Sequence, residues 1–170
     1  MKGNTALIRF LQQAVGYSLT GDAREQCLFF LHGKGANGKS TVIETISGLL
    51  GSYARHTRPE TFMLRKGESI SNDLAELENA RMVAAVELGE DRRFSEILLK
   101  QVTGQDTLKA RYLFHEYFEY APKFKLWLCG NHKPQVRGTD HAIWRRIRLI
   151  PWDITIPEAR QDKALLEKLK

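Results

Sequence analysis

One segment has residue types and spacing that suit phosphate binding: residues 33–41, Gly-Lys-Gly-Ala-Asn-Gly-Lys-Ser-Thr. Two glycines five positions apart, followed by lysine and serine, match the pattern of a phosphate-binding loop. Glycines let the backbone curl so that successive N–H groups point at phosphate oxygens, and the following helix presents its N-terminal donors to the same anion. Lys39 is expected to reach the β and γ phosphates, and the Ser40 hydroxyl to ligate Mg²⁺. The residues expected to contact the nucleotide are Gly33, Gly35, Ala36, Asn37, Gly38, Lys39, Ser40 and Thr41. The expected cofactors are ATP and Mg²⁺.

The elements on either side of this segment occur in the order that a phosphate loop requires. Residues 27–31 form a continuous apolar run, which predicts a strand buried on both faces. Apolar residues at helical spacing from Val42 to Leu50 predict a helix that ends near Gly51. A chance glycine-rich turn is the alternative, and the order strand, loop, helix argues against it.

Acidic residues follow a second apolar run, Met82–Val86, which also predicts a buried strand. A phosphate loop needs a carboxylate that holds the Mg²⁺ shell and polarises the attacking water. In α/β sheets such ligands lie at the carboxyl ends of neighbouring buried strands. Glu87 is the candidate at this strand end, as a catalytic residue and metal ligand, and Glu90 could share the role. The alternative is that both are solvated loop acids.

A polar side chain and two arginines complete the candidate catalytic set. Asn131 ends a third apolar run, from where it could reach the γ-phosphate or the attacking water, although such an Asn is often only a turn residue. The sequence that follows Asn131 is not the Asn-Lys-x-Asp of guanine recognition. Arg145 and Arg146 could stabilise charge on the transferring phosphoryl group, in the same subunit or a neighbouring one. A solvated basic helix end is the alternative.

Cations and aromatic rings are interleaved over residues 107–121, which we predict to form a β-hairpin with its tip near residues 114–116. This mixture suits single-stranded nucleic acid, because cations meet phosphates and flat rings stack on bases. The candidate DNA contacts are Lys109, Arg111, Phe114 and His115. Several rings of this segment must instead be core, because alternation buries one face of a hairpin.

The remaining patterns predict an α/β fold of three layers with a mainly parallel central sheet. Further strands are expected at 54–57, 124–129 and 147–152, and helices at 7–15, ending at Gly16, near 71–79, and at 95–102. We expect an N-terminal helical segment over 1–20, a nucleotide-binding core over 21–156, and a C-terminal helix over 157–170 that the natural chain may extend.

The composition of the 170-residue chain is that of an ordinary globular domain, with 42% hydrophobic and 27% charged residues. No apolar run is long enough to span a bilayer and no signal peptide is evident, so a cytoplasmic location is expected. A net charge of +6 permits nucleic-acid binding. The two cysteines, Cys27 and Cys129, lie in apolar runs and are expected to be reduced core thiols.

The ordered set of segments resembles the superfamily 3 helicase domain at the C-terminal end of phage and plasmid primase-helicases, a group related to the poxvirus primase-helicase. The resemblance rests on the glycine loop with Asn before Gly-Lys-Ser, on Val86-Glu87, on residues 100–106, on the Lys-Leu-Trp-Leu-x-x-Asn-His-Lys-Pro run of 125–134, and on the Trp-Arg-Arg run of 144–146. It covers the chain from about residue 11 to the end.

The resemblance implies an AAA+-like P-loop ATPase that assembles as a hexameric ring and translocates on single-stranded DNA. It implies that Lys39 and Ser40 hold phosphate and Mg²⁺, that Glu87 is the Walker B acid, and that Asn131 is the sensor. Arg145 or Arg146 is then the finger that reaches the next subunit. The hairpin before the sensor strand corresponds to the hairpin that contacts DNA, which puts His115 near the central pore.

The sequence also departs from this family. Residues 86–90 lack the adjacent acidic pair that many relatives have. The sequence therefore does not assign separate roles to Glu87 and Glu90. A primase domain is expected as an upstream partner, but the sequence contains none, nor a winged-helix segment after residue 170. Two other functions stay open: a P-loop kinase for a small molecule, and a non-catalytic module that assembles in response to nucleotide.

Overall fold

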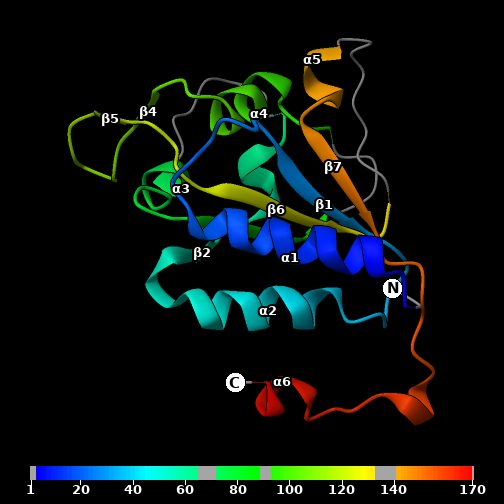
Figure 1. Cartoon of the computed structure of the whole chain (residues 1–170). Helices are drawn as coiled ribbons and strands as arrows, with labels where there is room; N and C mark the ends of the chain where they lie inside the picture. The colour runs from blue at the N-terminus through cyan, green and yellow to red at the C-terminus, as the bar shows by residue number, and fades with distance from the viewer. Residues whose placement is uncertain (1–2, 65–71, 89–92, 133–140, 170) are drawn as a thin grey trace.

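A parallel sheet of five strands organises the chain in the computed structural model, which describes residues 3–64, 72–88, 93–132 and 141–169 (Figure 1). The strand order is β2 (Ala54–His56), β3 (Met82–Leu88), β6 (Lys125–Gly130), β1 (Leu28–His32) and β7 (Ile147–Pro151). All four pairings are parallel, so the carboxyl ends of the strands share one edge. The predicted α/β class and parallel sheet are confirmed.

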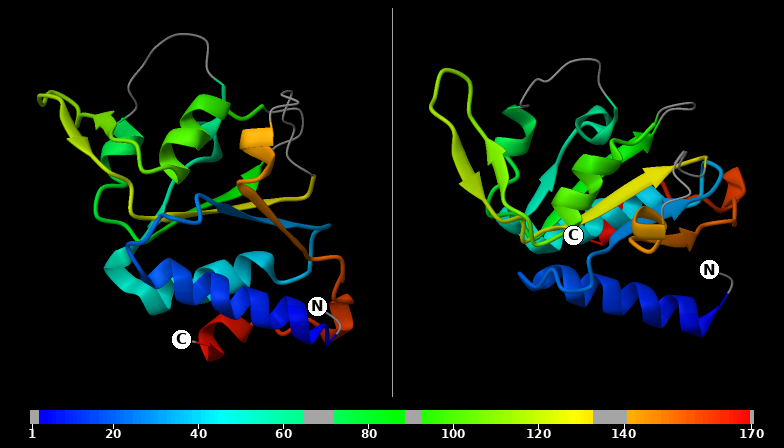
Figure 2. Two further views of the ribbon diagram at one scale, coloured as in Figure 1. Left: turned by 45° about the horizontal axis from the view of Figure 1, so that its top comes forward. Right: turned by 90° about the horizontal axis from the view of Figure 1, so that it is seen from above.

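Helices cover both faces of this sheet (Figures 1 and 2). On one face lie α1 (Thr5–Leu19) and α2 (Lys39–Leu50), which pack with Phe29 and Leu31 of β1. On the other lie α3 (Asn72–Ala75), α4 (Glu96–Thr103) and α5 (His141–Trp144), which pack with Leu28 and Phe30. Successive strand side chains point to opposite faces, so the apolar run of β1 fills two cores at once.

Short helical turns link these elements or follow them. Two 3-10 turns, Gly51–Tyr53 and Pro59–Phe62, flank β2, and a third, Glu158–Arg160, precedes α6 (Leu165–Lys168). The prediction of a single helix over 157–170 is therefore wrong, because the helical residues form two short separate turns. None of the helices in the described ranges is both long and apolar enough to cross a membrane.

The predicted β-hairpin is confirmed: β4 (Leu108–Ala110) pairs antiparallel with β5 (Phe118–Tyr120). It lies at the end of the molecule away from residues 33–38 (Figures 1 and 2). Two tyrosine hydroxyls fasten it to α3, because Tyr112 donates to the Ala75 carbonyl at 3.0 Å and Tyr120 to the Leu74 carbonyl at 2.6 Å. The Leu113 N–H also donates to the Asn72 side-chain oxygen of α3 at 3.0 Å, so the hairpin is fastened to α3 at the end of β5 and beyond the end of β4.

Helix α1 runs past Gly16, where we expected it to end, and stops at Leu19. Asn4 caps its first turn by accepting a hydrogen bond from the Leu7 N–H at 3.0 Å. Its last turn is held by Ser18, which is buried and accepts a 3.0 Å hydrogen bond from the Trp127 indole of β6. Tertiary packing thus outweighs the roughly 1 kcal/mol cost of a glycine inside a helix.

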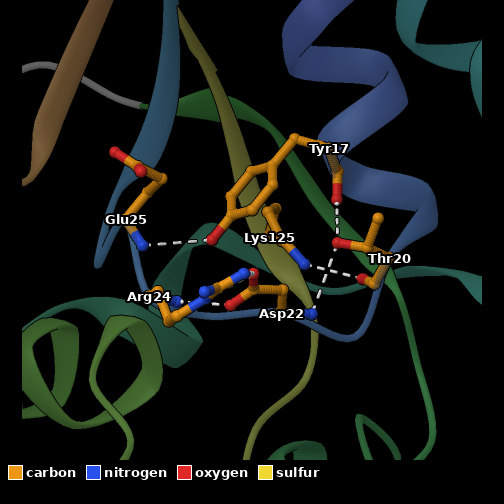
Figure 3. Close-up of polar contacts among 6 residues, drawn as sticks. All are labelled: Tyr17, Thr20, Asp22, Arg24, Glu25 and Lys125. Carbon is orange, nitrogen blue, oxygen red and sulfur yellow. Dashed lines mark hydrogen bonds and ion pairs between the residues drawn. The ribbon is translucent and has the colours of Figure 1, made fainter.

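A buried lysine joins the end of α1 to the sheet (Figure 3). The Lys125 ammonium donates to the Thr20 carbonyl at 2.7 Å and lies 4.4 Å from the centre of the Tyr17 ring. The Tyr17 hydroxyl in turn accepts the Glu25 N–H at 3.2 Å. Burial lowers the pKa of Lys125 to about 8. A cation at the carboxyl end of a helix is favoured by the helix dipole, which offsets part of the desolvation.

Replacing Lys125 with methionine is expected to change how stability depends on pH. Below about pH 8 the lysine is charged in both folded and unfolded states; between about 8 and 10.5 only the unfolded state keeps the proton. The wild type should therefore gain stability over that range, relative to Lys125→Met, by on the order of 3 kcal/mol. Urea unfolding of both proteins at pH 7.5 and 9.5 samples about 2 kcal/mol of this gain, and parallel pH profiles would contradict it.

Candidate functional site

Residues 33–38, which we name the glycine loop, connect β1 to α2 at the carboxyl edge of the sheet. Gly38 has φ of 83° and Ala36 has φ of 55°, so the backbone curls through the left-handed region before the helix starts. Within the described residues, the N-cap Gly38 makes no side-chain capping bond, and the Lys39 N–H donates to the Asn37 side-chain oxygen at 3.5 Å. The curl and the uncapped donors are what an anion at a helix N-terminus requires.

The Lys39 side chain turns back into the glycine loop. Its ammonium donates to the Gly33 carbonyl at 2.5 Å, the Lys34 carbonyl at 3.3 Å and the Asn37 side-chain oxygen at 3.1 Å. Burial lowers the pKa of Lys39, and the buried thiol of Cys129 on β6, whose pKa burial raises to about 12, lies close to it. An ammonium surrounded by oxygen acceptors, beside uncapped helix donors and the exposed Ser40 hydroxyl, fits the phosphates and Mg²⁺ of a nucleotide.

The glycine loop forms one wall of a cavity of about 530 Å³. The residues that line it are His32, Gly33, Lys34, Gly35, Asn131, His132 and Asp153. Asn131 comes directly after β6, which is paired with β1, and the Gly33 N–H donates to the Gly130 carbonyl at 3.3 Å. The structure therefore brings Asn131 to the glycine loop. It also adds Asp153, which the sequence analysis did not single out.

The strand that carries Glu87 is not the immediate neighbour of β1, because β6 lies between β3 and β1. Two strand spacings place the ends of β1 and β3 about 10 Å apart. The pairing of β3 with β6 shifts register between Ala85 and Leu88, so a bulge includes the backbone of Glu87. Bulges are frequent beside active sites. Glu90 lies outside the described residues.

Arg145 and Arg146 lie at the amino ends of the strands, whereas the glycine loop of the same chain lies at the carboxyl ends. They precede β7, whose first residue, Ile147, pairs with the first residue of β1. The length of a five-residue strand, about 15 Å, therefore separates them from the loop. Arg145 is exposed and donates to the Gln26 side chain at 2.8 Å, whereas Arg146 is buried and donates to the Ala142 carbonyl at 2.6 Å.

The candidate DNA contacts gather at the hairpin. Lys109 and Arg111 each lie 4.9 Å from the centre of the Tyr117 ring, and the tip carries His115 and Phe114, which is 95% exposed. On the other side of the hairpin, Tyr112 stacks on Phe118 at 5.7 Å and Phe118 on Tyr120 at 6.0 Å. The stacked rings of Tyr112, Phe118 and Tyr120 thus support the hairpin, whereas the Phe114 ring is exposed to solvent.

Alanine at Gly33 is expected to destabilise the fold, whereas alanine at Gly35 is not. A Cβ at Gly33 would lie 2.0 Å from the Trp152 carbonyl oxygen, so backbone must move, and we expect a cost of about 2 to 4 kcal/mol. A Cβ at Gly35 has nothing within 4 Å. Urea unfolding of the two variants measures the difference; equal free energies of unfolding would show that the backbone of residues 33 and 152 is not packed this closely.

Comparison with known proteins places the chain among viral relatives. It is 32% identical over 137 residues to "Putative helicase L207/L206" of Acanthamoeba polyphaga mimivirus, covering 79% of this chain and 14% of that protein. It is 29% identical over 153 residues to "Putative helicase 022R" of Frog virus 3, covering 86% of this chain and 16% of that protein. The chain thus spans about one seventh of the length of these relatives.

Two solved structures share the fold. The NrS-1 C-terminal region superposes with a TM-score of 0.64 at 15% identity, covering 93% of this chain and 38% of that one. JCV helicase superposes with a TM-score of 0.58 at 14% identity, covering 84% and 41%. Residues 31–146, which run from the end of β1 to Arg146, match the family described as "Family of unknown function (DUF5906)". Because this match spans more than half of the chain, the protein belongs to the DUF5906 family.

Proposed function

We propose that this chain is the motor domain of an ATP-dependent DNA helicase of the superfamily 3 type, in a replicative primase-helicase like those of phages and plasmids. The observation that carries the proposal is the glycine loop curled around Lys39, with Asn131 lining the same cavity. A buried ammonium, uncapped helix donors and an adjacent polar strand end are the parts that bind and act on a triphosphate. The three-layer P-loop fold of this proposal is supported by the parallel sheet with helices on both faces.

The viral relatives support the helicase part of this proposal, because both are named as helicases. The proposed cofactors are ATP and Mg²⁺. In the proposed division of roles, Lys39 holds the β and γ phosphates, Ser40 and Glu87 hold Mg²⁺, and Asn131 orients the attacking water. When bound there, Mg²⁺ would supply positive charge that stabilises the charge developing on the phosphates.

We further propose that the chain assembles as a hexameric ring and that Arg145 completes the site of a neighbouring subunit. Its distance from its own glycine loop supports action in trans, and its exposure favours it over the buried Arg146. A head-to-tail interface, in which one surface meets a different surface of the next copy, closes into a ring and repeats this contact around it. The tip of the hairpin would then contact single-stranded DNA, and the partner expected upstream is a primase domain.

Steady-state ATP hydrolysis with and without single-stranded DNA tests the function. We expect DNA to stimulate hydrolysis and Lys39→Ala to abolish it. Turnover that needs a nucleoside or sugar acceptor and ignores DNA would instead indicate a small-molecule kinase. Oligomerisation driven by ATP, with no hydrolysis even when DNA is present, would indicate a non-catalytic assembly module.

A further inference from the structure

A segment that follows β7 is bonded along the glycine loop. The Trp152 N–H donates to the His32 carbonyl at 2.6 Å, just before the loop begins. Four residues on, the Ile156 N–H donates to the Ala36 carbonyl at 2.7 Å. The Trp152 carbonyl approaches Gly33 so closely that a side chain there would collide with it. Residues 152–156 therefore hold the glycine loop at both ends.

Trp152 and Asn37 form a reciprocal pair at the centre of this contact. The indole N–H of Trp152 donates to the Asn37 carbonyl at 2.6 Å, and the Asn37 side-chain amide donates to the Trp152 carbonyl at 2.8 Å. Both residues are buried, at 7% and 8% exposed. A buried acceptor that loses its donor costs more than an exposed one, because water cannot replace the bond. The pair thus fixes the loop backbone one residue before Gly38.

The same asparagine touches the lysine of the phosphate site. Its side-chain oxygen accepts a hydrogen bond from the Lys39 ammonium at 3.1 Å, while its amide nitrogen is bonded to the Trp152 carbonyl. One planar amide therefore joins the segment after β7 to Lys39. The Asn37 amide also donates to the Lys34 carbonyl, and the ammonium to the Gly33 and Lys34 carbonyls, so contacts within the loop hold Lys39 as well. The bonds to Trp152 add the support for this amide that comes from outside the loop.

We propose that Trp152 is a positioning residue of the phosphate site, which acts through Asn37 to set the place of Lys39. This inference rests on the proposed function, since it concerns nucleotide binding by the same loop. The positioning role is expected to appear in nucleotide affinity and not only in stability. Trp152 is bonded to the backbone of residues 32 and 37 and is not one of the residues that line the cavity, so no contact with the nucleotide is required of it.

The chain offers a matched control for this role. Trp127 is also a buried tryptophan of the same core, and its indole N–H also makes one hydrogen bond, at 3.0 Å to the Ser18 hydroxyl. Phenylalanine at either position removes one buried indole donor and keeps an aromatic ring. In Trp152→Phe the glycine loop loses its hydrogen-bond donor, and in Trp127→Phe helix α1 does.

The experiment is calorimetric titration of Mg·ATP into wild type, Trp152→Phe and Trp127→Phe, at a temperature where circular dichroism shows each fully folded. We expect Trp152→Phe to weaken ATP binding about tenfold, because the nucleotide must then order the loop that the lost hydrogen bond held, at a cost of about that one bond. We expect Trp127→Phe to stay within about twofold of wild type. Equal affinities of the two variants would overturn the positioning role.

Asn37→Ala supplies a second variant if Trp152→Phe is too unstable to titrate, with the same expected loss of affinity. The two substitutions remove different hydrogen bonds of this pair: Trp152→Phe removes the indole donor to the Asn37 carbonyl, and Asn37→Ala removes the amide that bonds to the Trp152 carbonyl and to Lys39. If Trp152 acts through the Asn37 amide, the double variant should bind ATP no more weakly than Asn37→Ala alone; multiplied losses would contradict action through Asn37. Absence of ATP binding by the wild type would overturn the proposed function itself, and this result is distinct from equal binding by the variants.

Discussion

Mixing Lys39→Ala subunits with Arg145→Ala subunits is expected to restore ATP hydrolysis that neither variant supports alone. The first variant lacks the phosphate lysine but keeps the arginine, and the second has the reverse defect. An arginine finger is worth about 10³ to 10⁵ in turnover, so each pure variant should be nearly inactive. In randomly mixed rings about a quarter of the interfaces combine an intact glycine loop with an intact arginine.

The geometry explains why this complementation is expected from Arg145. Within one chain the arginine and the glycine loop lie at opposite ends of the strands. A subunit therefore cannot bring Arg145 to its own glycine loop without unfolding β7. Arg145 is exposed beside Gln26, and its guanidinium is available to a neighbouring copy. Buried Arg146, in contrast, is bonded to the Ala142 carbonyl, and Arg146→Ala is expected to lower stability by about 1 to 3 kcal/mol.

Two controls define the outcome of the mixing experiment. A Lys39→Ala/Arg145→Ala double variant mixed with either single variant should stay inactive, because no interface then holds both groups. Native mass spectrometry should verify that the subunits exchange into common rings. Full activity of Arg145→Ala alone, or no recovery in rings shown to be mixed, would rule out the proposed role of Arg145.

The local parts of the site could be predicted because their signal is local in sequence. The strand, glycine loop and helix lie within residues 28–50, and the apolar patterns that specify them are uninterrupted. The parallel sheet followed from strands too apolar to have an exposed face. The end of α1 and the extent of the tail were wrong, because burial of Ser18 and the packing of residues 157–169 depend on contacts that the helical pattern does not contain.

The long-range parts of the site could not be predicted from the pattern. Asn37 and Trp152 are 115 positions apart, and nothing near Trp152 in the sequence indicates that its indole bonds to the glycine loop. The place of β6 between β1 and β3 likewise depends on pairing among distant strands. A tryptophan at the end of an apolar strand indicated only a core residue. A buried indole N–H needs a hydrogen-bond acceptor, and this requirement could have suggested a polar partner for Trp152.

Phe114→Ala is expected to weaken binding to single-stranded DNA by about 5-fold to 150-fold without changing stability. Stacking of one base on an aromatic ring contributes about 1 to 3 kcal/mol, and this ring, 95% exposed at the hairpin tip, is available for it. Truncating so exposed a side chain should alter the free energy of unfolding by less than about 0.5 kcal/mol. Fluorescence anisotropy with labelled oligonucleotides, together with urea unfolding, measures both quantities.

Two variants separate stacking by Phe114 from other consequences of losing a ring. Tyr53→Ala removes another exposed aromatic, 56% exposed and placed beside β2 instead of on the hairpin, and should leave DNA affinity unchanged. Phe118→Ala removes the middle ring of the stack that supports the hairpin and should lower stability as well as affinity. DNA affinity that is the same for Phe114→Ala and wild type would show that the tip makes no base contact.

The hairpin would then contribute through Lys109 and Arg111, and Lys109→Ala should reduce the salt dependence of binding by about one ion.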